Sequence, residues 1–153
     1  MTARNVLFGV TSDFLQLSRG GGDGVLGIDG CLKQIMEIPG SHSATLVDGA
    51  SGLAVAAAGR ADPVDEHEDA AGTTDVVRAV LATPALSTTR TGDDIEEIIV
   101  CGTRGYHLIA LINDAFEGRL FLHLLVDRDK GNLALARLRV RELLGEMAGG
   151  EGA

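Results

Sequence analysis

The stretch RLFLHLLVDRDKGNLALARLRVREL, residues 119–143, joins a strand, a charged turn and a helix. Its first part is a nearly continuous apolar run that ends at Asp127, a pattern typical of strands with both faces covered. Asn132 is a residue type that caps helices, and apolar residues recur at helical spacing after it. The stretch therefore predicts a buried strand followed by a helix from about Asn132 to Met147.

Basic residues gather in this region of an acidic chain. The sequence holds 22 Asp and Glu against 13 Lys and Arg, yet five of those 13 basic residues lie between Arg128 and Arg141. One face of the predicted helix is apolar and should pack on a sheet; it carries Leu133, Ala136, Val140, Leu143, Leu144 and Met147. Arg137 and Arg141 flank that face, where their stems cover its rim. The other side carries Leu135, Leu138 and Arg139, which we take as a candidate partner surface.

Length and composition indicate one globular domain. The chain has 153 residues, 45% of them apolar, with four Phe, one Tyr and no Trp, so its core must be aliphatic. A net charge of −9 and few aromatic residues argue against a nucleic-acid partner, because phosphate binding needs a basic face. There is no apolar run of about 18 residues to span a membrane, and the N-terminal apolar run is too short for a signal peptide. We therefore expect a cytoplasmic protein.

The remaining elements follow from hydrophobic spacing and turn residues. Residues 28–36 have helical spacing, and Pro39-Gly40 ends that helix. Two short strands at 43–48 and 52–59 read as a hairpin. A helix follows Pro63 with Asp65 as its N-cap, and three strand-like runs come next, at 95–102, 106–114 and 119–127. The order helix, two strands, helix, three strands, helix predicts an α+β fold with a five-stranded antiparallel sheet covered on both faces.

The middle helix has a wider apolar face than packing on one sheet requires. Ala70, Val77 and Leu81 form one strip, and Val76 and Val80 form a neighbouring one. The second strip therefore needs a cover other than the sheet.

No stretch carries a recognisable catalytic or metal-binding pattern. The loop RGGGDG (residues 19–24) lacks the Gly-Lys-Ser/Thr ending of a phosphate loop and reads as a linker. VDEHED (64–69) reads as a solvated helix start, and DRDKGN (127–132) departs from a calcium loop at its glycine position. His107 and His123 lie inside apolar strands; a catalytic pair is the alternative to packed side chains satisfied by neighbours. We predict no catalytic residue, no cofactor and no metal, and hence no enzyme.

The two cysteines do not form a disulfide framework. Cys31 lies in a predicted helix and Cys101 ends an apolar run, so both are expected to be buried, reduced thiols.

Two stretches, together with the order of elements, resemble roadblock/dynein light chain domains. PGSHSATLVDGASGLAVAAAG (residues 39–59) is similar to the first hairpin of that family, with a Pro-Gly helix end, an apolar strand ending in Asp, a turn and a second strand. LFLHLLVDRDKGNLALARLRVREL (120–143) resembles the last strand and helix of the bacterial branch. The similarity covers residues 28–147, and the first twenty-odd residues fall outside it.

The resemblance implies that the middle helix covers one face of the sheet and the outer helices cover the other. It also implies a non-catalytic homodimer in which third strands pair and middle helices meet, with Val76, Val80, Ile95 and Ile98 in the interface. Bacterial members regulate a Ras-like small GTPase, which is the partner we expect. A signalling scaffold without effect on GTP turnover and a small-molecule sensor are the alternatives.

The ends of the chain are expected to lie outside the domain. We assign residues 1–24 to an N-terminal extension and glycine-rich linker, 25–147 to a roadblock-like domain and 148–153 to a disordered tail. An apolar strip of Val6, Val10, Phe14 and Leu17 predicts a helix over residues 5–17. That helix is expected to lie over Leu135 and Leu138, in the same subunit or across the dimer. In the alternative, the segment is a disordered tail and the first domain helix covers them.

Overall fold

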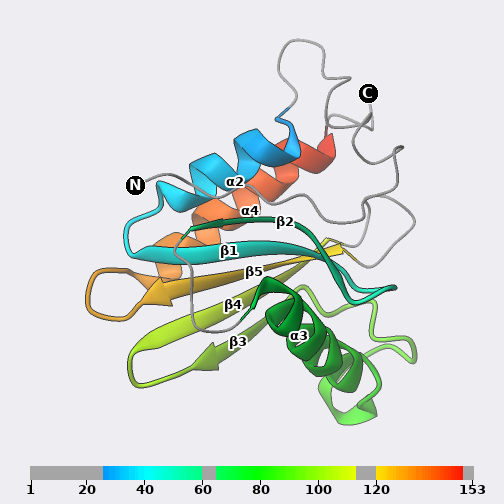
Figure 1. Ribbon diagram of the computed structural model, residues 1–153. Coiled ribbons are helices and arrows are strands. Elements are labelled where there is room, and N and C mark those ends of the chain that lie inside the picture. Colours follow the sequence, from blue (N-terminus) through cyan, green and yellow to red (C-terminus); the bar gives the residue numbers. More distant parts are fainter. Residues whose placement is uncertain (1–25, 60–64, 113–119, 150–153) are drawn as a thin grey trace.

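The computed structural model describes residues 26–59, 65–112 and 120–149 (Figure 1). Its elements, in chain order, are α2 (Ile28–Met36), β1 (Ser41–Asp48), β2 (Leu53–Gly59), α3 (Glu66–Leu81), the 3-10 turn η1 (Pro84–Leu86), β3 (Glu97–Cys101), β4 (Gly105–Ile112), β5 (Leu120–Asp127) and α4 (Leu133–Gly149). The predicted order of helices and strands is confirmed. Among the described residues, no helix is long and apolar enough to cross a membrane.

The five strands form one antiparallel sheet in the order β2-β1-β5-β4-β3. β5, the last strand in the chain, lies in the centre of the sheet between β1 and β4. This placement explains its nearly continuous apolar sequence, since a central strand is covered on both faces. β3 pairs only with β4 and forms one edge of the sheet.

Helices cover the two faces of the sheet as predicted. α2 and α4 lie side by side on one face, and α3 lies on the other (Figure 1). The larger core, between the sheet and the pair α2 and α4, is centred on fully buried side chains such as Ile35, Leu122 and Val140. The smaller core lies under α3 and includes Ala70, Val77 and Phe121.

The helix starts follow from capping residues in the sequence. The Asp65 carboxylate accepts a hydrogen bond from His67 N, and the Asn132 side chain accepts one from Leu135 N at 3.0 Å. Each cap satisfies a backbone N–H that has no partner inside its helix. The acidic residues in the first turn of α3 lie at the positive end of the helix dipole, and this interaction stabilises the helix.

Three expectations differ from the structure. Ile95 was assigned to the third strand but lies before it, because the loop continues to Glu96. Cys101 is exposed, since it ends an edge strand that no neighbour covers on its outer side, whereas Cys31 is buried. α4 continues to Gly149, two residues beyond the expected end at Met147. The predicted helix over residues 5–17 lies outside the described residues.

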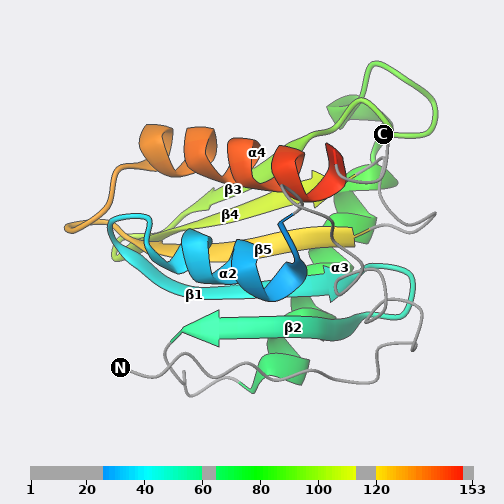
Figure 2. The same ribbon diagram turned by 90° about the horizontal axis from the view of Figure 1, so that it is seen from above.

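α3 covers only part of its face. It runs beneath the sheet across the strands, nearer to the end where β1 and β4 finish (Figure 2). At the opposite end, where β5 finishes and β4 begins, no described helix lies over this face of the sheet. Because α3 does not cover this end, side chains on this face of β4, such as His107, are half-exposed.

Candidate functional site

The open edge of β3 is the first candidate site. Gly102 N donates to Gly105 O, and Leu111 N donates to Glu96 O, which fixes the alternation of paired residues between β3 and β4. In an antiparallel pair, the residues between those hydrogen-bonded positions direct N–H and C=O away from the neighbour. Glu97, Ile99 and Cys101 therefore present their backbone groups to the open edge. A strand edge of this kind is a template for pairing with another strand.

Apolar side chains lie beside this edge on the α3 side. Val76 of α3 is 41% exposed and Val100 of β3 is 48% exposed. Of the other residues expected in a dimer interface, Val80 and Ile95 are half-buried, and Ile98 packs at the margin of the core under α3. The neighbouring Val77 is fully buried, as the first apolar strip requires.

The arginines of α4 divide between the sheet edge and solvent. Arg137 donates through Nε to Glu97 Oε1 of β3 at 2.8 Å, and also through Nη2 to the same oxygen. Arg141 Nη2 reaches that oxygen at 3.4 Å, and the Glu97 carboxylate raises the pKa of Arg137. Arg139 instead pairs with Glu142, three residues along the helix. Two arginines of the basic cluster thus fasten α4 to the edge strand.

Glu97→Gln is expected to lower the melting temperature by about 2–4 °C, which corresponds to about 1 kcal/mol for a domain of this size. The variant keeps the shape of the side chain but removes the charge that both arginines share. Glu142→Gln is the matched control, because the pair with Arg139 is exposed on both sides and should change the melting temperature by less than about 1 °C. Circular dichroism melts of both variants measure the difference, and equal shifts would contradict this role for Glu97.

The outer side of α4 presents the expected apolar pair. Leu135 is 41% exposed and Leu138 is 53% exposed within the part of the chain that the structure describes. α2 packs beside α4 but does not cover these two leucines. The alternative in which the first domain helix shields them is therefore wrong.

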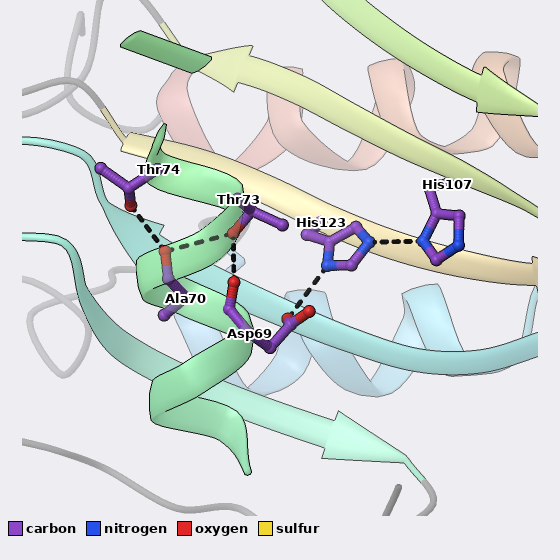
Figure 3. A network of polar contacts seen from close by, with 6 residues as sticks. All are labelled: Asp69, Ala70, Thr73, Thr74, His107 and His123. Atoms are coloured by element: carbon purple, nitrogen blue, oxygen red, sulfur yellow. Dashed lines mark hydrogen bonds and ion pairs between the residues drawn. The ribbon is translucent and has the colours of Figure 1, made fainter. Parts of the chain in front are cut away.

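A chain of polar contacts links α3 to the sheet (Figure 3). The Asp69 carboxylate in the first turns of α3 lies 3.0 Å from His123 Nδ1 of β5. His123 Nε2 lies 3.0 Å from His107 Nδ1 of β4, and the two imidazole rings stack with centroids 5.2 Å apart. His123 is buried, while His107 is half-buried at the open end of the face. Each histidine therefore has a hydrogen-bond partner: His107 contacts His123, and His123 contacts both His107 and Asp69.

The carboxylate fixes the direction of the first hydrogen bond. An ionised carboxylate only accepts, so His123 donates through Nδ1 to Asp69. Between the two histidines, one ring nitrogen donates and the other accepts, according to the tautomer of each ring. The arrangement holds the ring of His107 in one orientation, in the way that a second group orients a histidine in many binding and catalytic sites.

The sequence places the two histidines in successive apolar runs, but it does not fix the register of the last hairpin and so does not show that they touch. Ile109 faces His123 and His107 faces Leu125, so both histidines point to the α3 side. A shift of one residue in this register would place them on opposite faces. Asp69 was noted only as an acid at a helix start, and its distance from His123 along the chain gave no signal of contact.

The other titratable groups do not add a metal centre. Among the described residues, no three His, Cys, Asp or Glu side chains are grouped to hold a metal ion. Burial raises the pKa of the Cys31 thiol to about 12, so this cysteine is a packed thiol of low reactivity.

Comparison with known proteins gives a fold. No protein-family model matches the chain, and no curated protein matches it either. Solved structures do match: Myxococcus xanthus MglB has a TM-score of 0.68 and 17% identity, and the match covers 94% of this chain and 92% of that one. The gliding protein MglB from Thermus thermophilus has a TM-score of 0.66 and 18% identity, with both chains fully covered. A roadblock/LC7 domain from Streptomyces avermitilis has a TM-score of 0.65 and 17% identity, covering 82% of this chain and 98% of that one. The predicted roadblock fold is confirmed.

Proposed function

We propose that this chain, which has the roadblock/LC7 fold, is a non-catalytic homodimeric module that binds a Ras-like small GTPase in the cytoplasm and modulates its nucleotide cycle. The observation that carries the proposal is the match to MglB over nearly the whole of both chains. The resemblance of residues 120–143 to the bacterial branch of the family supports a GTPase as the partner. The proposed module spans residues 25–147, with residues 1–24 as an extension.

The open edge supports the dimer. Two copies of β3 related by a two-fold axis can pair antiparallel, because Glu97, Ile99 and Cys101 direct their backbone groups outward at alternate positions. Pairing of this kind would join two five-stranded sheets into one. It would also bring together the α3 sides of both copies, which explains the exposure of Val76 and Val100 in a single chain.

The outer side of α4 is the proposed partner surface. Leu135 and Leu138 are helical neighbours with a charged rim formed by Arg139 and Glu142. An apolar centre with a polar rim is the usual anatomy of a protein interface. This surface lies on the face of the sheet opposite α3.

Val76→Glu is expected to convert a dimer into a monomer at micromolar concentration, as measured by multi-angle light scattering. A charge placed in the apolar interface would lie next to its own copy across the two-fold axis, and both carboxylates would lose water. Ala71→Glu is the matched control, because Ala71 is exposed on another side of α3 and its exchange should leave the dimer intact. A monomeric wild-type chain would contradict the proposed dimer.

The same variants test the function. A small GTPase captured from the native cytoplasm is assayed for GTP hydrolysis and nucleotide exchange, alone and with the wild-type chain, Val76→Glu or Ala71→Glu. A changed rate with wild type and Ala71→Glu, reduced with Val76→Glu, is the expected result. Binding without any change in either rate would favour the scaffold, and failure to bind any small GTPase would overturn the proposed partner.

A further inference from the structure

The two leucines on the outer side of α4 have no cover among the described residues. Leu135 and Leu138 are both exposed, one turn apart on the same side of the helix. Arg139 and Glu142 on this side pair with each other at 2.9 Å. The charges beside the leucines therefore neutralise each other, which suits an occupant that is itself apolar and nearly uncharged.

The chain carries a segment of this chemistry in residues 5–17. Asp13 is its single charged side chain. Four apolar residues of the segment recur at helical spacing and form one strip: Val6, Val10, Phe14 and Leu17. The other stretches outside the described ranges are at most seven residues long and contain no such strip: 60–64, 113–119 and 150–153. The N-terminal segment is therefore the part of this chain that fits the surface.

This segment is long enough to reach the leucines of its own chain. The described chain begins at Leu26, which packs against the core. The start of α2 lies next to the C-terminal end of α4 (Figure 2), and Cys31 Sγ is 3.9 Å from Leu143 O. Leu135 precedes Leu143 by eight residues, which is about 12 Å along the helix. Residues 18–25 span up to about 26 Å when extended, so they bridge that distance.

A cover of this size is held weakly. Burial of Phe14 and Leu17 favours the docked state, because both are large apolar side chains. The loss of conformational entropy in about a dozen residues opposes it by a comparable amount. A partner that binds the same surface can therefore displace the segment.

We propose that residues 5–17 dock as a helix on Leu135 and Leu138 of the same chain and compete there with the small GTPase. This regulation rests on the proposed function, in which the outer side of α4 binds the GTPase. The GTPase then binds only those molecules from which the segment has left, and its apparent affinity falls in proportion to their fraction. A segment that is docked in about nine molecules of ten weakens GTPase binding about tenfold.

Docking is measured without the GTPase. The chain has no Trp, so Phe14→Trp places a single tryptophan in the strip. Its emission is expected at short wavelength in the full chain. Adding Leu138→Glu should move the emission to the wavelength of tryptophan in water, because a carboxylate at the centre of the docked surface opposes burial of the strip.

Leu86→Glu is the matched control for this measurement. Leu86 is 58% exposed and belongs to η1, which contacts α3 rather than α4. This variant should leave the emission unchanged, and both leucine variants should keep a cooperative melt because the substituted side chains are exposed. Emission of the parent Phe14→Trp chain at the wavelength of tryptophan in water, or equal shifts with Leu138→Glu and Leu86→Glu, would overturn the docking.

Competition is measured with the small GTPase captured from the native cytoplasm, titrated against the full chain. Phe14→Ser should tighten GTPase binding by about threefold to tenfold, because the strip loses its largest apolar side chain and leaves the surface free more often. Phe8→Ser is the matched control, since Phe8 falls on the other side of the predicted helix, and it should bind the GTPase as wild type does.

The two measurements separate this regulation from the proposed function. A GTPase that binds the wild-type chain and Phe14→Ser with equal affinity leaves the proposed function standing and overturns the competition. Failure of every variant to bind a small GTPase overturns the proposed function and the competition with it, whereas the tryptophan emission still decides whether the segment docks on α4.

Discussion

Gly40→Ala is expected to lower the free energy of unfolding by about 3–5 kcal/mol, a large part of the roughly 5–15 kcal/mol that stabilises a domain. Gly40 has a φ of +84°, which alanine adopts only with strain. A Cβ at this position would lie 2.5 Å from Gly131 Cα and 2.6 Å from Gly131 N. Because these are backbone atoms, no side-chain rotation relieves the contact.

The clash matters because two turns meet at this point. The turn that ends α2 lies against the turn between β5 and α4, and Asp127 N donates to Gly40 O at 2.8 Å. Displacing either turn therefore disturbs the entry into β1 or into α4. The measurement is urea denaturation, which reports the free energy of unfolding directly.

The control is Gly145→Ala in α4, where a Cβ would meet nothing within 4 Å. Alanine is favoured over glycine inside a helix by about 1 kcal/mol, so this variant should be slightly more stable than wild type. If Gly40→Ala unfolded within about 1 kcal/mol of wild type, the turns would not be packed as the structure shows.

Val77→Glu is expected to abolish the cooperative fold or to reduce its stability by at least about 4 kcal/mol. Val77 is 2% exposed in the core under α3, next to Ala70 and Phe121. Substitution removes a buried apolar side chain and places a carboxylate where the core offers no partner. Loss of the far-UV circular dichroism signal, or of a cooperative melt, is the expected observation.

Val76→Glu provides the comparison, since the same substitution falls on the adjacent, 41% exposed valine. This variant should keep a cooperative melt and a folded spectrum while losing the proposed dimer. The two effects separate folding from association at neighbouring positions. Equal loss of structure in both variants would contradict the assignment of Val77 to the core and Val76 to the surface.

Most of the fold could be predicted because its elements are specified locally. The spacing of apolar residues in α2 and α4, the caps Asp65 and Asn132, and the Pro39-Gly40 stop each act within a few residues of their own position. The coverage of β5 on both faces could be inferred from its continuous apolar sequence, although its central place in the sheet could not. Local sequence marks strand ends poorly, and Ile95 was misplaced for that reason. Cys101 was assigned to the right strand, but its exposure depends on the edge position of β3, which is a property of the whole sheet.

The basic cluster that begins at Arg128 shows where local information ends. The sequence predicts that arginines border the apolar face of α4, and they do. It does not predict that Glu97 forms ion pairs with both Arg137 and Arg141, because nothing near Glu97 in the chain indicates its partners. Arg137 lies 40 residues further along the sequence. That pairing requires the sheet to place β3 beneath α4.

The sequence by itself determined the type of each element, its approximate ends and the side that each buries, because backbone propensity, capping and hydrophobic spacing are local properties. Only the tertiary structure decided the contacts that depend on register and on the meeting of distant turns. A single hairpin register brings His107 and His123 to one face, and α3 then brings Asp69 to them. The close packing of two turns leaves no room for a side chain at Gly40 or at Gly131. A polar or glycine residue acquires these roles from neighbours far along the chain, so its own sequence surroundings do not reveal them.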